Sequence, residues 1–336
     1  MERVIKLGII GAGRIGKLHA ENIVKNFVNV DVKAIADIFA DSIKDWAENL
    51  GIQNIYTDYK EILNDPEIEA VLVCSSTDTH TLISIEAAQA GKHIFCEKPI
   101  DVDPEQIQGV LDAVEKGRVK FQVGFNRRFD HNFRAVRELV NQGKIGDVHI
   151  VKVTSRDPEP PPLDYIKVSG GMFMDMTIHD FDMVRFLTGS EVVEVYANVA
   201  VLVDPAIGEA GDVDTALITL KFANGAVGMI DNSRKAAYGY DQRVEVFGSK
   251  GCITVENDTP SSAVLSTAEG VLSDKPKYFF LERYKDSFVA EMQEFFDSIR
   301  NDRQPSVSSI DGFKSVLIAL AAQKSVKEGR PIKLDE

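Results

Sequence analysis

The stretch Gly11-Ala12-Gly13-Arg14-Ile15-Gly16 follows an apolar run at residues 4–10 and precedes a segment of helical periodicity at residues 17–26. A lone G-x-G-x-x-G pattern is weak, but between a strand and a helix it is typical of a turn that binds a dinucleotide. Gly11 permits the tight turn, Gly13 lets the backbone approach a pyrophosphate, and Gly16 lets the helix pack closely on the strand. Free N–H groups at the helix N-terminus favour the anion, so Arg14 and Ile15 are also predicted cofactor residues.

The first 125 residues alternate short apolar runs with segments of helical periodicity. The predicted strands cover residues 4–10, 30–36, 70–75, 93–96 and 121–123, and the predicted helices cover residues 17–26, 40–49, 82–90 and 104–116. This β-α alternation is the pattern of a doubly wound parallel sheet with right-handed crossovers. We therefore expect a dinucleotide-binding domain over residues 1–124.

Beyond residue 134 the pattern changes to longer strands joined by hairpin turns. The turn Ala223-Asn224-Gly225 lies between two apolar strands, and Asn-Gly supplies the positive φ of a tight hairpin. Gly248-Ser249-Lys250-Gly251 lies between two more. With a helix near residues 132–142 and two closing helices near 285–300 and 312–328, this half predicts a second, α+β domain over residues 125–336. Its sheet is expected to be open, with five or six strands.

The composition indicates a globular protein with an acidic surface. Asp and Glu number 52 against 38 Lys and Arg, giving a formal net charge of −14. Such a surface repels phosphate backbones and anionic lipid, which argues against nucleic acid and membrane as partners. No signal peptide or membrane-spanning run is predicted. Cys74, Cys96 and Cys252 fit no zinc spacing, so buried reduced thiols in a cytoplasmic enzyme are expected.

A carboxylate at the end of the second predicted strand bears on the choice of cofactor. Asp37 lies 37 − 16 = 21 residues beyond Gly16, where it can accept hydrogen bonds from the adenosine ribose hydroxyls. It would repel a 2′-phosphate, and Ile38-Phe39 offers no basic group to hold one. The sequence therefore favours NAD over NADP, with a surface Asp that merely begins a helix as the alternative.

Small polar residues follow the predicted strand at residues 70–75. Ser75, Thr77 and His80 occur in Cys74-Ser75-Ser76-Thr77-Asp78-Thr79-His80 and are predicted to border the crevice that holds the rest of the cofactor. The same residues also fit an ordinary helix N-cap by Ser76 or Thr77.

The segment Phe95-Cys96-Glu97-Lys98-Pro99 ends a buried strand with charged residues. Lys98 is expected to point into the crevice at the carboxyl edge of the sheet, and Glu97 beside it is a predicted cofactor residue. The peptide bond between Lys98 and Pro99 is a candidate for the cis form.

A third polar segment runs from Gly170 to Met183. On one helix, residues four and seven apart share a face, which would place Asp175, His179 and Asp182 together. An exposed ion pair between Asp175 and His179 is the alternative. With a cofactor fold upstream and a lysine at a strand end, the pattern favours a catalytic site.

The chemistry follows from the charges that move when a secondary alcohol is oxidised. An imidazole titrates near neutral pH, so His179 is suited to take the hydroxyl proton. Lys98 can stabilise developing alkoxide character, and Asp175 can hold either group in place. Asp182 and Arg127 could bind neighbouring hydroxyls. No metal-binding cluster is visible in the sequence, and this chemistry needs none.

Four motifs together resemble the Gfo/Idh/MocA oxidoreductase superfamily over essentially the whole chain. They are Gly11-x-Gly13-x-x-Gly16, Glu97-Lys98-Pro99, Gly124-Phe125-Asn126-Arg127-Arg128-Phe129 and Asp175-x-x-x-His179-Asp180. The resemblance implies a Rossmann domain and a C-terminal α+β domain with an open, largely antiparallel sheet, paired through its exposed face into a homotetramer. It also implies a Lys–Asp–His catalytic set, which falls on Lys98, Asp175 and His179.

The segments Gly170-Gly171 through Phe186-Leu187 and Arg156-Asp157-Pro158 are most similar to the inositol-oxidising branch of this superfamily. That likeness implies a polyol substrate and the NAD-dependent oxidation of myo-inositol to scyllo-inosose (2-keto-myo-inositol). Besides the catalytic set, the implied substrate contacts fall on Arg127, Asp157, Asp182 and Tyr238, with Tyr240 competing for the last assignment.

Two other functions stay open at this point. One is a dehydrogenase of the same superfamily that acts on scyllo-inositol, an aldose or a keto sugar. The other is a non-catalytic regulator that binds NAD, although a sensor has no need for a proton relay of the kind that Lys98, Asp175 and His179 suggest.

Overall fold

The computed structural model describes residues 3–334, which divide into two compact units. The first unit contains the chain up to Asn126 together with Asp286–Lys314, and the second contains Arg127–Lys285 together with the residues from Ser315 onward. The prediction of a second domain over residues 125–336 therefore placed one segment in the wrong half, because residues 286–314 belong to the first unit.

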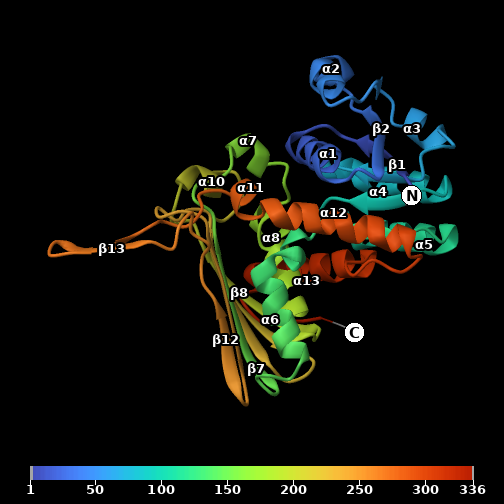
Figure 1. The fold of residues 1–336 in the computed structure, drawn as a ribbon. Coiled ribbons are helices and arrows are strands. Elements are labelled where there is room, and N and C mark those ends of the chain that lie inside the picture. The colour runs from blue at the N-terminus through green and yellow to red at the C-terminus, as the bar shows by residue number, and fades with distance from the viewer. Residues whose placement is uncertain (1–2, 335–336) are drawn as a thin grey trace. The chain divides into compact units, whose positions relative to one another are not determined.

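The first unit is built on a six-stranded sheet in the order β3-β2-β1-β4-β5-β6, with every described pair parallel (Figure 1). This confirms the doubly wound sheet. The strands are β1 (Ile5–Ile10), β2 (Val30–Ala36), β3 (Asn54–Tyr56), β4 (Ala70–Val73), β5 (His93–Cys96) and β6 (Phe121–Val123). The crossover helices are α1 (Arg14–Asn26), α2 (Ala40–Asn49), α3 (Lys60–Asn64), α4 (Thr77–Gln89) and α5 (Pro104–Gly117).

Two elements of this unit differ from the prediction. Strand β3 and helix α3 were not predicted, because three and five residues are too few to show a period. Helix α4 begins at Thr77, five residues before the predicted start at residue 82, so the polar stretch after β4 is the first turn of a helix.

The core of the first unit is completed by a helix from far along the chain. Helix α12 (Lys285–Arg300) contributes Met292, Phe295 and Phe296, all fully buried, to the hydrophobic cluster that contains Leu7 and Phe95. A parallel sheet needs helices on both faces to bury its apolar strands. Helix α12 supplies part of that cover, which explains why residues 286–314 belong to this unit.

The second unit is built on a seven-stranded mixed sheet in the order β12-β11-β7-β10-β9-β8-β15. Its strands are β7 (Val148–Arg156), β8 (Val192–Ala200), β9 (Thr215–Phe222), β10 (Val227–Ser233), β11 (Asp241–Gly248), β12 (Gly251–Val255) and β15 (Ile332–Lys333). Among the described pairs only β7 and β10 run parallel. The predicted open, largely antiparallel sheet is confirmed, and the two-residue β15 is the strand that the prediction missed.

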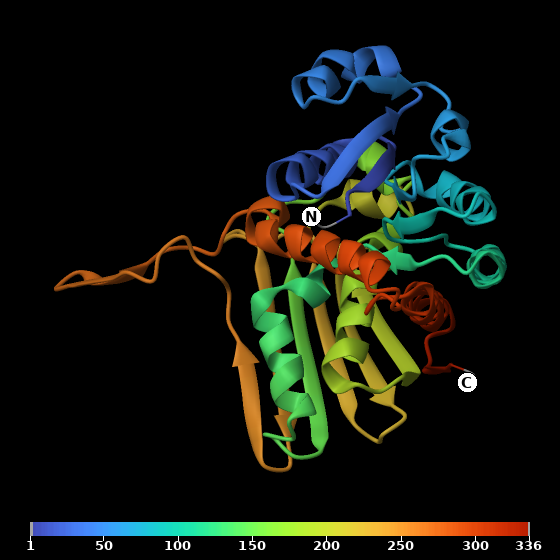
Figure 2. The same ribbon diagram turned by 45° about the vertical axis from the view of Figure 1, so that its right-hand side comes forward.

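One face of this sheet is covered and the other is more exposed. Helix α6 (His131–Asn141) lies along the covered face (Figure 2), together with α9 (Ile178–Thr188). Val151, Val153 and Ser155 of β7 are buried there. The predicted hairpin at residues 223–225 joins β9 and β10, with Gly225 at φ +88°. The remaining helices are α7 (Leu163–Ile166), α8 (Gly171–Asp175), α10 (Pro205–Glu209), α11 (Phe280–Arg283) and α13 (Ser309–Glu328), which passes from one unit to the other.

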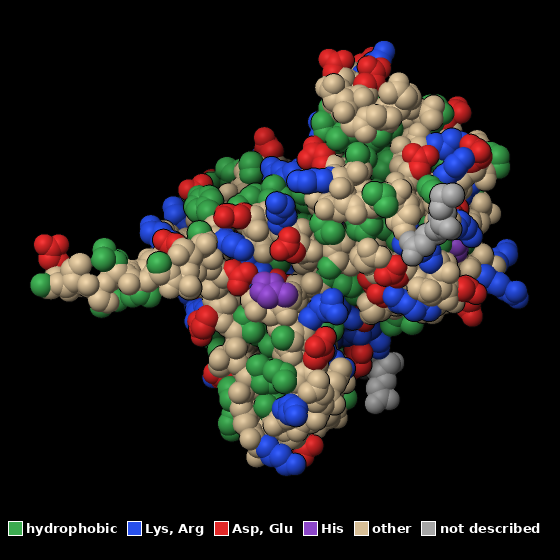
Figure 3. Space-filling model, in the orientation of Figure 1, with side chains coloured by type: hydrophobic (Ala, Val, Ile, Leu, Met, Phe, Trp, Pro, Cys, Tyr) green, Lys and Arg blue, Asp and Glu red, His purple; other side chains and the backbone are tan. Residues whose placement is uncertain are grey.

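A two-stranded hairpin of β13 (Val264–Thr267) and β14 (Gly270–Ser273) projects from the second unit as a thin arm (Figures 1 and 3). All eight of its strand residues are exposed. Nothing in the composition predicted this arm.

Two of the three cysteines are buried, as predicted. Cys74 and Cys96 are buried, whereas Cys252 on β12 is exposed, which corrects the expectation of three buried thiols. In the described part of the chain, no helix combines the length and the hydropathy of a membrane span.

Candidate cofactor and substrate sites

The three glycines of the first turn have different surroundings. A Cβ atom on Gly11 (φ +92°) would lie 2.5 Å from the backbone nitrogen of Ser75, and one on Gly16 would lie 2.0 Å from the carbonyl oxygen of Gly11. A Cβ on Gly13 would meet nothing within 4 Å. Gly11 and Gly16 are therefore required by the fold itself, whereas Gly13 leaves open space above the turn, where a pyrophosphate can approach the backbone.

The N-terminus of α1 fits an anion. Gly13 is the N-cap, and no side chain of the described chain makes a capping hydrogen bond there. The N–H groups of the first turn, including those of Arg14 and Ile15, have no partner within the helix and lie at the positive end of its dipole. Together with the space at Gly13, this end of α1 fits the phosphates of a dinucleotide.

Asp37 is fixed at the end of β2 beside the glycine turn. Its Oδ2 accepts a hydrogen bond from the backbone N–H of Ala12 at 2.7 Å, and its Oδ1 accepts one from Phe39 at 2.8 Å. Ile38 and Phe39 are 75% and 68% exposed, so no basic side chain is provided at these two positions. The remaining lone pairs of this oriented carboxylate are suited to ribose hydroxyls.

The loop after β4 is organised by a buried histidine. Nδ1 of His80 lies 2.9 Å from the carbonyl oxygen of Pro99, and Nε2 lies 3.0 Å from that of Ser75. His80 thus links the loop after β4 to the loop after β5. Because both of its ring nitrogens face these carbonyl oxygens, the cofactor contact predicted for it gains no support. Ser75 and Thr77 are partly accessible, and Ser76 is the N-cap of α4 without a side-chain bond.

Lys98 lies at the carboxyl edge of the same sheet. Strands β1, β4 and β5 are neighbours, so the glycine turn, Ser75 and Lys98 follow adjacent parallel strands at one edge. The peptide bond between Lys98 and Pro99 is cis. Glu97 accepts hydrogen bonds from Nε2 of His19 at 2.8 Å and from the backbone N–H of Lys98 at 3.3 Å. Its predicted cofactor contact gains no support, because its carboxylate has partners inside the protein.

In the second unit, the predicted single helix carrying Asp175, His179 and Asp182 is wrong. Helix α8 ends at Asp175, and α9 begins at Ile178. The break is fixed by Thr177, whose buried hydroxyl donates to Oδ1 of Asn232 at 2.7 Å. Because Asn232 lies on β10, 55 residues from Thr177, the periodicity of the segment around Thr177 could not predict this hydrogen bond.

Asp175 and His179 are nevertheless singled out by their exposure. Between Met172 and Arg185 these two are the only residues that are partly accessible, and all the rest are buried. Asp175 accepts hydrogen bonds from the Tyr165 hydroxyl at 2.9 Å and from Arg234 at 3.2 Å, so its carboxylate is held in place. A carboxylate and an imidazole that both reach solvent from a buried segment can exchange protons with a bound ligand.

Two ion pairs hold α9 in the second unit. Asp180, fully buried, pairs with Arg127 at 2.6 Å, and Asp182 forms a two-bond pair with Arg128 at 2.8 and 2.6 Å. Burial raises the pKa of Asp180, and Arg127 opposes that shift. The substrate contacts predicted for Arg127 and Asp182 gain no support, since both side chains are bonded internally. Asp180 was missed as a functional residue because its partner is remote in sequence.

Asp157 follows β7 and is partly buried. Burial raises its pKa to about 7, against the opposing charges of Arg234 and Arg127, while Asp175 adds to the rise. A carboxyl group that titrates near neutral pH is uncommon outside functional sites.

The two candidate tyrosines differ in exposure. Tyr238 is 41% exposed, and its hydroxyl donates to Asp241 at 2.5 Å and accepts from Arg156 at 3.0 Å. Tyr240 is only 5% exposed, with its hydroxyl 3.3 Å from Arg127. Of the two, Tyr238 is the one that a ligand can reach.

The parallel sheet, its glycine turn and the carboxylate that ends β2 define the first unit as a dinucleotide-binding domain of an oxidoreductase. Residues 5–125 match the oxidoreductase family with an NAD-binding Rossmann fold, and residues 133–254 match the GFO/IDH/MocA C-terminal domain. The chain therefore belongs to the Gfo/Idh/MocA oxidoreductase family, and its cofactor is NAD.

Similarity to individual relatives extends over the full chain. The chain is 51% identical to an uncharacterized oxidoreductase, YrbE, of Bacillus subtilis, with coverage of 100% of this chain and 98% of the relative. It is 49% identical to the myo-inositol 2-dehydrogenase of Thermotoga maritima (99% of each) and 45% identical to the inositol 2-dehydrogenase of Rhizobium meliloti (98% and 99%).

Solved structures agree with this assignment. The crystal structure of a probable dehydrogenase from Thermotoga maritima superposes with a TM-score of 0.96 at 49% identity, covering 98% of both chains. That of a scyllo-inositol dehydrogenase from Lactobacillus casei, with bound NAD(H) and scyllo-inositol, gives 0.92 at 30% identity, covering 98% of this chain and 99% of that one.

The different surroundings of the glycines predict different effects of substitution. Gly13→Ala should leave the melting temperature unchanged, because the added Cβ meets nothing, but should weaken NAD binding at least about tenfold by filling the space of the pyrophosphate. Gly16→Ala, the matched comparison, should lower the melting temperature. Calorimetry of unfolding and of NAD binding measures both, and unweakened NAD binding by Gly13→Ala would contradict this account of the turn.

The raised pKa of Asp157 predicts a pH-dependent stability. Between about pH 4 and pH 7 the folded protein keeps a proton on Asp157 that the unfolded chain has lost, so ionisation of this group lowers the free energy of unfolding as pH rises. Asp157→Asn should therefore be more stable than the parent near pH 8 and equal to it near pH 4. Melting temperatures across this range test the point, with Asp164→Asn, whose side chain is 99% exposed, as the control. A constant difference between Asp157→Asn and the parent would refute it.

Proposed function

We propose that this protein oxidises myo-inositol to scyllo-inosose with NAD. The observation that carries the proposal is full-length similarity, at 49% and 45% identity, to relatives named for inositol 2-dehydrogenation. The exposure pattern supports it, because the second unit offers solvent two polar groups, Asp175 and His179, from a segment that is otherwise buried.

Eight of the ten cofactor residues predicted from the sequence are kept in the proposed site; His80 and Glu97 are left out because their side chains bond within the protein. Gly11, Gly13, Arg14, Ile15 and Gly16 bind the pyrophosphate through backbone N–H groups and the dipole of α1. Asp37 binds the adenosine ribose, while Ser75 and Thr77 border the remainder of the site. When bound, NAD supplies the hydride acceptor.

Lys98, Asp175 and His179 form the proposed catalytic set. The substrate C–H bond breaks with its electron pair as hydride, and an imidazole nitrogen of His179 takes the hydroxyl proton, so that the carbon–oxygen bond becomes a carbonyl. The Lys98 ammonium stabilises the negative charge that builds on the oxygen. Asp175, held by Tyr165 and Arg234, supports the positive charge on His179.

Asp157 and Tyr238 are the proposed contacts to other substrate hydroxyls, since Asp157 is only partly buried and Tyr238 is exposed in the second unit. Arg127 and Asp182 act instead as positioning residues. Their ion pairs with Asp180 and Arg128 hold α9, the helix that carries His179.

A scyllo-inositol substrate is the second candidate. The chain is 34% identical over its full length to a scyllo-inositol 2-dehydrogenase (NAD(+)) of Bacillus subtilis. The higher identity to the two relatives named for myo-inositol or inositol oxidation favours the first candidate. A regulator that binds NAD without chemistry has no use for an accessible Asp175 and His179.

The substrate is tested by NADH formation. With NAD present, myo-inositol should give the largest kcat/KM in a panel that contains scyllo-inositol and pyranose sugars. Lys98→Ala should lower kcat by at least about a hundredfold, the scale of losing an electrostatic stabiliser, with NAD binding largely intact. A pyranose that is oxidised while myo-inositol is not would overturn the substrate, and unchanged turnover of Lys98→Ala would overturn the catalytic set.

We further propose that the protein is a cytoplasmic homotetramer that works in inositol catabolism. On the more exposed face of the second sheet, Leu217, Val227 and Phe247 are 43–45% exposed, and apolar side chains in such positions favour pairing with another copy. Light scattering at micromolar concentration should give four times the chain mass of 37.1 kDa, and a monomer would contradict this proposal.

A further inference from the structure

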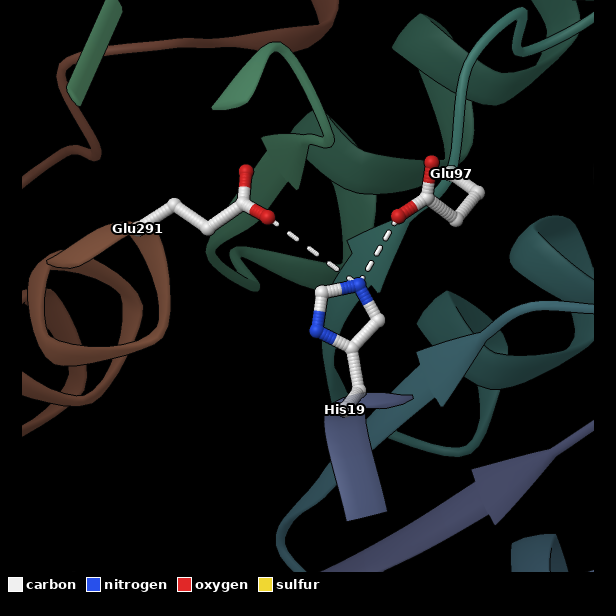
Figure 4. Close-up of side chains that lie close together, drawn as sticks. All are labelled: His19, Glu97 and Glu291. Carbon is white, nitrogen blue, oxygen red and sulfur yellow. Dashed lines mark hydrogen bonds and ion pairs between the residues drawn. The ribbon is translucent and has the colours of Figure 1, made fainter. Parts of the chain in front are cut away.

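A group of three titratable side chains, two of them buried and one partly buried, lies in the first unit. It consists of His19 on α1, Glu97 after β5 and Glu291 on α12, and its ligand-type atoms all lie within 4.8 Å of one another. Both carboxylates point at the same ring nitrogen of His19 (Figure 4). Nε2 of His19 is 2.8 Å from Oε1 of Glu97 and 4.0 Å from Oε1 of Glu291.

The hydrogen bonds of this group fix where its protons lie. Nδ1 of His19 is buried and has no hydrogen-bond partner, so a proton there would be an unsatisfied donor, and the tautomer with the proton on Nε2 is favoured. That proton is donated to Glu97, which also accepts the backbone N–H of Lys98. With two donors aimed at it, Glu97 is the hydrogen-bond acceptor of the pair.

Glu291 is in the opposite situation. It is fully buried, and neither of its oxygens has a hydrogen-bond partner. Phe95 and Phe288 lie edge-on against the neighbouring imidazole, at centroid distances of 5.2 and 5.9 Å. An ionised carboxylate in such surroundings, next to a second carboxylate, is strongly unfavourable.

Neither Glu97 nor the neighbouring thiols lower the free-energy cost of ionising Glu291. Burial raises the pKa of Glu291 well above its ordinary value, and the charge of Glu97 adds to the rise. Burial also raises the pKa of the thiols of Cys74 and Cys96, so both are neutral at physiological pH.

We propose that Glu291 is a protonated carboxylic acid that positions the Glu97–Lys98 turn by hydrogen bonding to the Glu97 carboxylate, either directly after side-chain rotation or through one water. The arrangement is an acid paired with a carboxylate, with one proton between them. Its effect on turnover rests on the proposed role of Lys98, because Glu97 in turn accepts the N–H of that lysine.

A divalent cation is the other occupant that two carboxylates and an imidazole suggest. A metal-ligating histidine almost always donates its second ring N–H to an acceptor, and Nδ1 of His19 has none. The three side chains therefore fit a shared proton better than a metal ion.

Infrared difference spectroscopy tests the protonation state in the full chain. The spectrum of Glu291→Gln subtracted from that of the parent, at neutral pH and with ¹³C-labelled glutamate, should show the C=O stretch of a neutral carboxylic acid. Carboxylate bands in its place, or one equivalent of transition metal in the purified protein, would overturn the proposal. This readout needs no substrate, so it is independent of whether the proposed function is correct.

Kinetics test the positioning role. Glu291→Leu should lower kcat about three- to tenfold, the scale of one lost hydrogen bond, with the Kd of NAD little changed. Glu291→Gln keeps a donor and the shape, so it should recover most of that loss. Ser298→Ala, a buried α12 variant whose hydroxyl bonds only to its own helix, is the packing control. Equal loss in Glu291→Gln and Glu291→Leu, or the same loss in Ser298→Ala, would assign Glu291 a purely structural role.

Discussion

Helix α1 can begin where it does because Gly16 carries no side chain. A single added carbon there would lie 2.0 Å from the carbonyl oxygen of Gly11, so the helix would have to move away from β1. The same close approach brings the N-terminus of α1 to the edge of the sheet, next to Asp37 and the loop after β4. The cofactor site of the first unit therefore depends on one contact between backbone atoms, and the side chains around it refine a geometry that this contact creates.

The second unit depends on paired charges in its interior. Asp180 is fully buried, and its carboxylate is stabilised by Arg127 and by the Asn232 side chain. Oδ1 of the same Asn232 accepts a hydrogen bond from the hydroxyl of Thr177, the residue between α8 and α9. A buried charge that lost its partner would be costly, so the network specifies one arrangement of this segment. The partly accessible Asp175 and His179 lie on either side of a break that the buried Thr177 and Asn232 specify.

The features that could be predicted from the sequence are those determined by residues close together in the chain. The glycine turn, the Asn-Gly hairpin and the end of β2 at Asp37 each depend on residues within about 25 positions of one another, and all were predicted. Strands β3 and β15 have three and two residues, which is too short for a period. The break at Thr177 depends on Asn232, 55 residues away, and the partners of Arg127 and Arg128 are as distant. Glu291 gave no sign of its role, because an acidic residue in a helix is ordinarily solvated, and only burial beside His19 and Glu97 changes its chemistry.

The return of the chain to its first unit has a consequence for how the protein is made. The hydrophobic cluster that contains Leu7 and Phe95 also includes Phe295 and Phe296, which follow residues 127–285 of the second unit in the sequence. On the ribosome, even β6, the last strand of the first unit, ends 285 − 123 = 162 residues before the start of the helix that covers part of the sheet's apolar face. The first unit therefore cannot be completed until residues 127–285 of the second unit have been made, and the second unit in turn needs the residues from Ser315 onward. Until then, that uncovered face is the surface that a chaperone would have to shield.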